Sequence, residues 1–303
     1  MKQFLVNLKN NNPFLLYLWA KNRQRLGISD LQKNNDKQAI INLYRNFSGK
    51  IPDLEYPKTF SEKLQWLKLN NRDERMKVCA DKYEVREYLI NKKYSGILSN
   101  TLAIYSSVAE IDLENLPDKF VIKATHGSGW NLIVNNKHKV NWWIWKKIMN
   151  IWLHDNIFWP GREWPYKNMK PRLIVEEYLE EKSGELTDFK FFCFNGKAHF
   201  IQANKGRNTN NHAQNFYDLD WKILPFGKDL KPRPDIKINA PVNLNKMIGI
   251  AQDLAEPFPF VRVDFYEVNS KIIFGEMTFY PKSGLPDFIP QDYDNVLGNY
   301  LTI

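Results

Sequence analysis

The sequence predicts an α+β fold, because short strand patterns alternate with helical patterns and antiparallel pairs are mixed among them. Asn195-Gly196 gives the strongest hairpin signal, at the centre of an alternating apolar and polar stretch, 188–202. Two more strand patterns, FPFVRVDFYEV and KIIFGEMTFYPKSG, lie near the C-terminus and are separated by Asn269–Lys271. These pairs indicate antiparallel sheets combined with helices.

The other elements follow from hydrophobic periodicity and turn residues. Residues 2–47 are expected to be helical, with Asn-rich interruptions at 10–12 and 34–35. Ser61 is the expected N-cap of a helix that ends near Asn70. Further helices are expected over 79–94, 137–154 and 241–256, and further strands over 101–105, 120–124, 131–134 and 171–179.

The composition is that of a soluble globular protein with a basic surface. Of the 303 residues, 43% are hydrophobic, and the net charge of +9 suits nucleic acid, a membrane surface or small anions. No lysine-rich tail, zinc-finger spacing or aromatic RNA-binding signature is present, so a phosphate ligand is favoured and nucleic acid is not expected. Cys79 and Cys193 lie far apart and lack a C-x-x-C partner, which predicts a reduced, cytoplasmic protein.

An apolar run, FLLYLWA at 14–20, has Lys and Arg residues on both sides. The run is too short to span a bilayer, and the basic sequence after it does not resemble a signal-peptide cleavage site. A helix here could pack on the core. Alternatively, residues 1–30 could lie on the inner face of a membrane, where basic residues beside aromatic and leucine side chains bind.

The stretch FVIKATHGSGWN, 120–131, combines a short apolar strand with a loop that contains Gly127 and Gly129. Successive backbone N–H groups of such a loop can bind an anion, and Lys123 would add a positive charge. The loop alone is equally compatible with an ordinary hairpin turn, since short glycine motifs are common.

Two terminal strands carry the polar groups best suited to a metal. Arg262 and Asp264 share one face of the first strand, and Glu276 and Thr278 share one face of the second. For Asp264 to lie opposite Glu276, the simplest antiparallel register needs a three-residue loop, 269–271, whereas a two-residue loop would separate the carboxylates. Mg²⁺ suits such a pair of oxygen ligands; a surface hairpin with Arg262 paired to its neighbours is the alternative.

Six stretches taken together resemble one known family. In chain order they are DKYEVREYL, FVIKATHGSGWN, VEEYLEE, DFKFFCFNGK, FPFVRVDFYEV and FGEMTFYPKSG. Their order resembles that of ATP-grasp proteins and, more closely, the ATP-grasp family named for the teichuronopeptide biosynthesis protein TupA. The resemblance implies an ATP-grasp fold, in which two α+β subdomains grip ATP, here with a helical N-terminal extension.

The same resemblance implies a division of the chain into four parts. These are a helical N-terminal region at 1–78, a pre-grasp segment at 79–119, a lid subdomain at 120–180, and a core subdomain with the magnesium-binding strands at 181–303.

The resemblance also implies which residues bind ATP. Lys82 and Lys123 match the two lysines directed at the phosphates. The loop match implies a mobile lid, which would close on the phosphates and would be poorly ordered without nucleotide. The implied nucleotide ligands from the lid, from the hinge that reads adenine, and from the strand after it are His126, Gly127, Ser128, Gly129, Glu176, Glu177, Tyr178, Leu179, Asp188 and Lys190.

Magnesium ligands and a catalytic cation are implied in the terminal strands. Asp264 and Glu276 match the metal ligands, and Arg262, with Lys123, matches the cations that act on the transferred phosphate. Thr278 stands where many ATP-grasp enzymes have asparagine, and its hydroxyl remains a suitable ligand.

By resemblance, the expected function is ATP-dependent ligation of a carboxylate to an amine through an acyl phosphate, in cell-surface polysaccharide assembly. The substrates would be a small-molecule or glycan carboxylate and an amine. Two alternatives stay open: a kinase that phosphorylates a sugar or glycan hydroxyl, and a non-catalytic nucleotide-binding module. The sequence indicates no oligomeric state.

Overall fold

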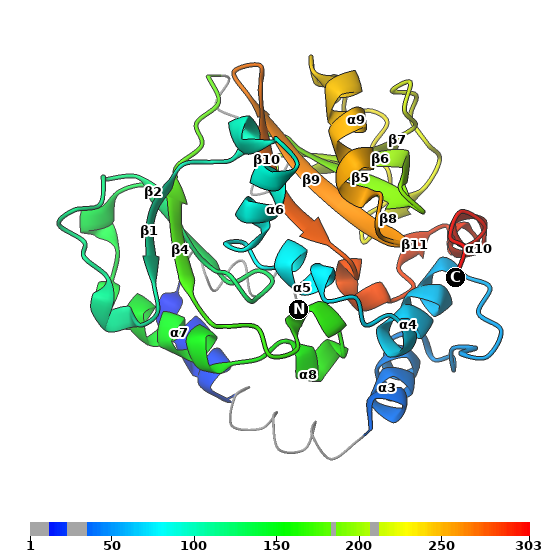
Figure 1. Ribbon diagram of the computed structural model, residues 1–303, viewed down its shortest axis with the longest axis horizontal. Coiled ribbons are helices and arrows are strands. Elements are labelled where there is room, and N and C mark those ends of the chain that lie inside the picture. The colour runs from blue at the N-terminus through cyan, green and yellow to red at the C-terminus, as the bar shows by residue number, and fades with distance from the viewer. Residues whose placement is uncertain (1–11, 23–34, 183–185, 207–211) are drawn as a thin grey trace. The chain divides into compact units, whose positions relative to one another are not determined.

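The structure, a computed structural model, describes residues 12–22, 35–182, 186–206 and 212–303 (Figure 1). Contacts divide the chain into two compact units. Unit 1 comprises the described part of Met1–Ala39 with Asp81–Tyr83 and Ser99–Tyr178; unit 2 comprises Ile40–Ala80, Glu84–Leu98 and the described part of Leu179–Ile303. The four-part division made from the sequence stays a prediction.

The helices lie close to where periodicity places them. A helix covers 13–22, and the others are α3 (Asp36–Ser48), α4 (Phe60–Asn70), α5 (Arg75–Ala80), α6 (Val85–Asn91), α7 (Trp142–His154), α8 (Phe158–Gly161), α9 (Leu244–Ala255) and α10 (Tyr293–Gly298). Short 3-10 turns are η1 (Ser95–Ile97), η2 (Val108–Glu110), η3 (Lys137–Lys139), η4 (Trp164–Tyr166) and η5 (Pro281–Gly284). The single helix expected over 79–94 is wrong, because a turn at 81–84 separates α5 from α6.

The expected N-cap of α4 is also wrong. Thr59 caps this helix, because its hydroxyl accepts from the Glu62 N–H while the Glu62 side chain accepts from the Thr59 N–H. Ser61 instead donates its hydroxyl to Asp294 at 2.9 Å, which ties α4 to α10.

Unit 1 is built on a four-stranded antiparallel sheet in the order β1-β4-β2-β3. Its strands are β1 (Thr101–Tyr105), β2 (Phe120–Ala124), β3 (Asn131–Val134) and β4 (Leu173–Glu177). One face packs on α7, where Phe120 and Ile122 of β2 are buried with Ile148 and Met149 of the helix. Residues of the opposite parity, including Lys123, project from the other face.

The N-terminal helix 13–22 docks on the core of unit 1. Pro13 begins it, and the Asn12 side chain accepts a hydrogen bond from the Leu15 N–H, as an N-cap does. Leu16 is buried in the same hydrophobic cluster as β2 and α7. Packing on the core is therefore confirmed for this helix, although it still exposes Phe14, Leu15 and Leu18.

Unit 2 is built on a five-stranded antiparallel sheet in the order β10-β9-β5-β6-β7. Its strands are β5 (Asp188–Phe194), β6 (Lys197–Lys205), β7 (Ala213–Tyr217), β9 (Phe260–Val268) and β10 (Lys271–Thr278), and β8 (Gly227–Lys228) pairs separately with β11 (Phe288–Ile289). The predicted Asn195-Gly196 turn is confirmed, with both residues at positive φ. Helix α9 packs on β5, β6 and β9, and the buried Cys193 thiol lies 3.8 Å from the Ala251 carbonyl of this helix.

The β9–β10 hairpin corrects the predicted loop. Val268 pairs with Lys271, so the loop has two residues, Asn269 and Ser270, and the three-residue loop is wrong. Asp264 nevertheless pairs with Glu276, because the register shifts between Phe274 and Glu276. Gly275 is the extra residue of a β-bulge, and this bulge keeps the two carboxylates opposed.

Side-chain burial explains why β10 needs the bulge. Ile272, Phe274 and Met277 are all buried on the sheet face that packs on α9. In a regular strand, Met277 would lie on the opposite face from Ile272 and Phe274, because alternate residues face opposite sides. An unbroken strand would place Ile272 and Phe274 on the same face as Glu276. One extra residue between them lets the apolar side chains face the core while Glu276 faces the opposite side.

Within the ranges described above, the structure has no helix that is long and apolar enough to cross a membrane.

We expect Gly275→Ala to destabilise the protein by about 1–3 kcal/mol. A Cβ at this position would lie 3.0 Å from the Asp264 carbonyl oxygen and 3.3 Å from the Tyr266 ring, and neither can move without disturbing the strand pair. Urea unfolding measures the change. The control is Gly249→Ala in α9, where a Cβ meets nothing within 4 Å; this change should stabilise by about 0.5–1 kcal/mol. Equal effects of the two variants would contradict the role of Gly275.

Candidate functional site

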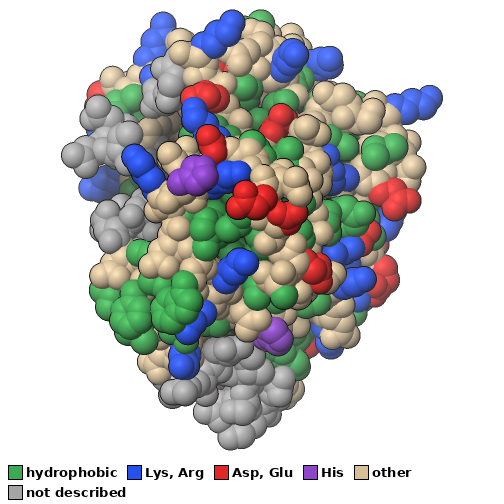
Figure 2. Space-filling model, turned by 90° about the vertical axis from the view of Figure 1, so that its left-hand side faces the viewer, with side chains coloured by type: hydrophobic (Ala, Val, Ile, Leu, Met, Phe, Trp, Pro, Cys, Tyr) green, Lys and Arg blue, Asp and Glu red, His purple; other side chains and the backbone are tan. Residues whose placement is uncertain are grey.

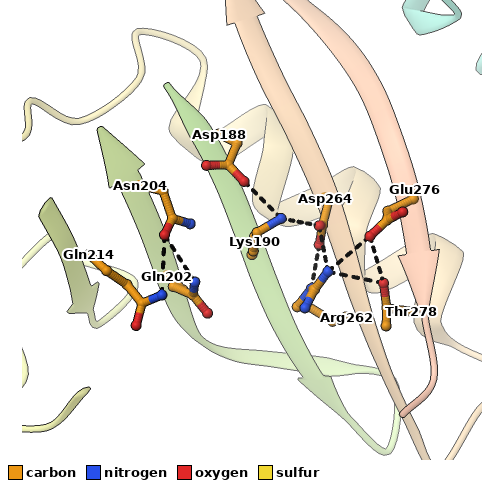
Figure 3. Close-up of polar contacts among 9 residues, drawn as sticks. All are labelled: Asp188, Lys190, Gln202, Asn204, Gln214, Arg262, Asp264, Glu276 and Thr278. Carbon is orange, nitrogen blue, oxygen red and sulfur yellow. Dashed lines mark hydrogen bonds and ion pairs between the residues drawn. The ribbon is translucent and has the colours of Figure 1, made fainter. Parts of the chain in front are cut away.

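One face of the unit 2 sheet carries a row of charged side chains. The register pairs Lys190 with Asp264, Asp264 with Glu276, and Arg262 with Thr278. Directly opposed residues of antiparallel strands share a face. This face is opposite the one that carries Cys193 and packs on α9. The charged row is defined as Asp188, Lys190, Arg262, Asp264, Glu276 and Thr278 (Figure 3).

Ion pairs and hydrogen bonds join the row from one end to the other. Lys190 forms ion pairs with Asp188, at 2.8 Å, and with Asp264. Arg262 donates to both Asp264 oxygens, from Nε at 2.6 Å and from Nη2 at 2.7 Å. The same Nη2 donates to Glu276 at 3.1 Å and to Thr278 at 3.0 Å. Three carboxylates and two cations therefore form one connected network.

Most of this network is buried, so its charges must balance one another. Asp264, Asp188 and Lys190 are 3%, 3% and 6% exposed, so each charge must be compensated by its neighbours. Burial by itself lowers the pKa of Arg262, but the ion pair with Asp264, followed by Glu276 and Asp188, raises it above its ordinary value. Arg262 is therefore a permanent cation, and the row as a whole has one more negative than positive charge.

The end of the row at β9 and β10 fits a hard divalent cation. Asp264 and Glu276 offer carboxylate oxygens and Thr278 offers a hydroxyl, all on one face, which is the donor set that Mg²⁺ prefers. The Glu276 side chain is 40% exposed and could turn toward an ion. Among the residues that the structure describes, no three His, Cys, Asp or Glu side chains gather as a metal site, so the Thr278 hydroxyl would be needed as a ligand.

An uncharged amide row continues the charged row onto β6 and β7. It consists of Gln202, Asn204 and Gln214, since Gln202 pairs with Lys190 and Asn204 pairs with both Asp188 and Gln214. The Asn204 side-chain oxygen accepts from both glutamine amides at 3.3 Å (Figure 3). The Asn204 Nδ2 and Gln214 Oε1 atoms are buried and have no hydrogen-bond partner among the described residues.

The sequence analysis missed the amide row, although it contained a signal. Asn204 and Gln202 are polar residues at the positions of β6 that share a face with Phe200, so the same face changes from aromatic to polar along the strand. On that face Phe192 stacks on Phe200 with centroids 4.6 Å apart. The polar rows are thus bordered by a packed aromatic cluster.

In unit 1, Lys123 and Glu176 meet on the sheet face that is not covered by α7. Lys123 Nζ lies 2.5 Å from Glu176 Oε2, and the Ser99 hydroxyl donates to Glu176 Oε1 at 2.5 Å. Glu176 lies opposite Val121, two residues before Lys123. The two residues predicted to contact phosphate and adenine are thus brought together.

The other hinge residues have separate local roles. Glu177 accepts a hydrogen bond from the Asn100 N–H at 2.9 Å, and the Lys119 ammonium lies 5.8 Å from the Tyr178 ring centroid. Tyr178 is the last residue of unit 1, and Leu179 begins the final segment of unit 2. The hinge sequence therefore coincides with the point where the chain passes from one unit to the other.

The predicted lid loop is held at its base and exposed at its tip. Lys82 Nζ donates to the Gly127 carbonyl at 2.5 Å, and its backbone N–H donates to the Thr125 carbonyl at 3.2 Å. The Trp130 ring covers Gly127 so closely that a Cβ there would lie 2.1 Å from it. Only Ser128 and Gly129 are exposed. The predicted mobility of residues 125–130 stays a prediction.

His126 does not present its side chain as a phosphate ligand. The ring is 4% exposed, its Nε2 lies 2.8 Å from the Trp152 carbonyl of α7, and it contacts Trp130 edge to face. Burial lowers the pKa of His126, although the hydrogen bond to Trp152 opposes the change. A buried neutral imidazole supports the loop from below; the predicted contact of its ring with phosphate does not fit this arrangement.

Comparisons with known proteins identify one family. A protein-family model described as TupA-like ATPgrasp matches residues 62–302. A comparison with curated protein sequences gives no match.

Several solved structures resemble the chain at low identity. D-alanine–D-alanine ligases from Bacillus anthracis, complexed with ATP, and from Helicobacter pylori are each 12% identical with TM-scores of 0.40, over 67% and 74% of this chain. An L-amino acid ligase from Bacillus licheniformis is 8% identical over 83% of this chain, with a TM-score of 0.43. This chain spans 55%, 62% and 55% of the three proteins, respectively. The family match alone carries the assignment that follows.

We expect His126 to make stability depend on pH in the acidic range. Its pKa is lowered in the folded state, whereas in the unfolded chain it is about 6.5. The contribution of neutral His126 to the free energy of unfolding is therefore present above pH 6.5. It is lost as the pH falls toward the pKa of the folded state, by at most about 1.4 kcal/mol per pH unit. Urea unfolding at pH 7.5 and 5.5 measures this loss of stability. The free energy of unfolding should fall less between the two pH values for His126→Gln than for the parent protein, and glutamine retains a donor for the Trp152 carbonyl.

The control for this measurement is His138→Gln, because the His138 side chain is 74% exposed. This variant should keep the pH dependence of the parent. If His126→Gln also kept it, the neutral structural role of His126 would be wrong.

Proposed function

Because this chain belongs to the TupA-like ATP-grasp family and has the α+β ATP-grasp fold, we propose that it is an ATP-dependent ligase that joins a carboxylate to an amine. The charged row carries the proposal. Ligase chemistry on ATP needs oxygen ligands for a metal ion together with fixed cations for the transferred phosphoryl group. The oxygen ligands would come from Asp264, Glu276 and Thr278. The fixed cations would be Arg262 and Lys190.

Each unit carries residues that are candidates for ATP contacts. Lys123 and Lys82 would pair with its phosphates, and the exposed Ser128-Gly129 tip would offer backbone N–H groups to the same oxygens. Lys123 is paired with Glu176, and Lys82 with the Gly127 carbonyl. On ATP binding, the two lysines would exchange these partners for phosphate oxygens. Glu177, Tyr178 and Leu179 would contact adenine, and Asp188 the ribose.

The proposed reaction has two steps. A carboxylate oxygen of the acceptor attacks the γ-phosphorus of ATP, the bond to the β-phosphate oxygen breaks, and ADP leaves. The amine nitrogen then attacks the acyl carbon, phosphate leaves, an amide forms and one proton is released. Bound Mg²⁺, held by Asp264, Glu276 and Thr278, would neutralise phosphate charge. Arg262 and Lys190 would stabilise the charge that develops on the transferred group, and a closed lid would exclude water from the acyl phosphate.

The amide row supports a hydroxylated acceptor. Asn204 Nδ2 offers donors and Gln214 Oε1 offers an acceptor, both buried and next to the cationic part of the face. Buried polar atoms without partners disfavour an apolar ligand and favour one with hydroxyl groups, such as a sugar carboxylate. Assembly of cell-surface polysaccharide on the cytoplasmic side of the membrane is the setting that we propose from the family match, and a hydroxylated acceptor is compatible with it.

The two alternatives predict different products. ADP release with purified protein, Mg²⁺ and panels of uronic acids, amino acids and amines tests the ligase. A product mass equal to acid plus amine minus water supports ligation; a product that retains phosphate on a hydroxyl supports a kinase. Tight ATP binding with no ADP release across the panel would support a non-catalytic module and overturn the proposal.

We expect Glu276→Gln to reduce ADP release by about 100-fold or more, because a neutral amide holds Mg²⁺ far less well than a carboxylate. Raising the Mg²⁺ concentration should recover part of the loss. Glu256→Gln, the same change at an exposed position outside the row, should leave the rate unchanged. Unchanged turnover of Glu276→Gln would exclude this carboxylate as an essential ligand.

We expect Gln214→Met to raise KM for the acceptor carboxylate about tenfold while KM for ATP stays the same. Methionine keeps the length of the side chain but removes its hydrogen-bonding atoms, and Asn204 keeps Gln202 as a partner. Gln291→Met at an exposed position is the matched control. A parallel rise of both KM values would place the amide row in nucleotide binding instead.

A further inference from the structure

A hollow on unit 1 brings lysine and aromatic side chains together. It has a volume of about 530 Å³ and lies between the N-terminal helix 13–22 and α7. Tyr17 and Lys21 line it from the first helix, and Trp143, Lys146 and Lys147 line it from the second. The opposite faces of these helices are apolar because they bury Leu16 and Met149 in the hydrophobic core. Core packing does not account for the aromatic side chains that line the hollow.

Among the described residues, no acid pairs with the three lysines of this hollow. Lys147 Nζ lies 3.9 Å from the Trp143 ring centroid and 5.7 Å from that of Tyr17, and Lys21 lies over the same Tyr17 ring at 5.6 Å. No acidic residue lines the hollow, and none of the described acidic residues forms an ion pair with these lysines. Like charges this close favour an anion beside them.

Large apolar side chains surround the lysines. Trp143 is 64% exposed, and Phe14 and Leu18 of the N-terminal helix are 46% and 44% exposed. Helical spacing places Phe14 and Leu18 beside Tyr17 and Lys21, because residues three and four apart are neighbours. Figure 2, which faces the side of the molecule where α7 lies, shows hydrophobic side chains gathered with Lys and Arg side chains beside them.

The sequence around the N-terminal helix adds to the positive charge. From residue 1 to residue 29 there are five Lys and Arg residues and no Asp or Glu. Bilayers with anionic lipids select this combination, since lysines bind the headgroups while Trp, Phe and Leu enter the interface.

We propose that Phe14, Tyr17, Leu18, Lys21, Trp143, Lys146 and Lys147 form a docking surface for a membrane that contains anionic phospholipid. Each lysine next to such a surface strengthens binding by about fivefold. A soluble anion would use the lysines but would leave Phe14, Leu18 and Trp143 exposed, whereas a lipid surface satisfies both groups. The proposal does not depend on the ligase activity, since none of these residues belongs to the charged row, the amide row or the lid.

Binding to vesicles tests the surface. The full chain is mixed with vesicles of phosphatidylcholine alone, or with about 30% phosphatidylglycerol, and the bound fraction is measured by flotation. We expect binding to the anionic vesicles that weakens as salt is raised from about 0.1 to 0.5 M, and little binding to phosphatidylcholine. The double variant Lys146→Gln, Lys147→Gln should weaken partitioning about 20-fold, and Trp143→Ser about fivefold or more.

Matched controls separate the surface from net charge. Lys222→Gln with Lys246→Gln changes the charge equally at exposed positions of unit 2, and Val242→Ser removes an apolar side chain that is 81% exposed. These variants should bind like the parent, and all variants should keep its circular dichroism spectrum and thermal midpoint.

Three outcomes would overturn the proposal. These are the absence of binding to anionic vesicles, equal losses in the lysine variant and its control, and a dimer in sedimentation that Trp143→Ser dissociates. The last result would assign the surface to a second copy of the chain.

Discussion

The pairing of Arg262 with Asp264 is the interaction on which the proposed site depends. Asp264 is buried and the Arg262 side chain is only 13% exposed, so each charge needs compensation by its neighbours. Arg262 also reaches Glu276 and Thr278, so the same guanidinium holds the remaining oxygen ligands in place. The one negative charge that remains on the row is a physical reason for a cation to bind there. The β-bulge at Gly275 serves this arrangement, because it sets which side chains of β10 join Arg262.

Much of the fold was predictable because it depends on local pattern. The strands of both sheets other than β7, together with α7, α9 and the Asn195-Gly196 hairpin, were recognised from alternation, periodicity and turn residues. The errors arose where two local signals competed. Thr59 and Ser61 can both cap a helix, and only the contact of Ser61 with Asp294, far along the chain, decides between them. The length of the loop at 269–270 was predicted wrongly because β10 was assumed to be a regular strand. Its buried apolar residues change from even positions, at Phe274, to an odd position, at Met277, which indicates an extra residue between them.

The candidate site residues were predicted from resemblance more than from physical argument. Local sequence placed Asp264 and Glu276 on strands, but their opposition required knowledge of the bulge. Gln202, Asn204 and Gln214 were missed because amides in a strand can face solvent, and burial is set by the whole sheet. His126 is a different case: the resemblance implied a nucleotide ligand, whereas its ring is buried and lies against the Trp152 carbonyl. The N-terminal helix shows that core packing and an exposed apolar face can occur on one element.

The interleaving of the two units has a consequence for synthesis of the protein. The chain changes unit five times, and unit 2 takes residues from 40 onward to the C-terminus. Unit 1 has all its residues once Tyr178 has been made, whereas β9 and β10 come from the last part of the chain. At about 5–20 residues per second, translation of the 100 residues from Tyr178 to Thr278, the end of β10, takes roughly 5–20 s. During that interval the nascent chain contains every residue of unit 1, including those of the proposed docking surface, whereas β9 and β10 have not yet been made.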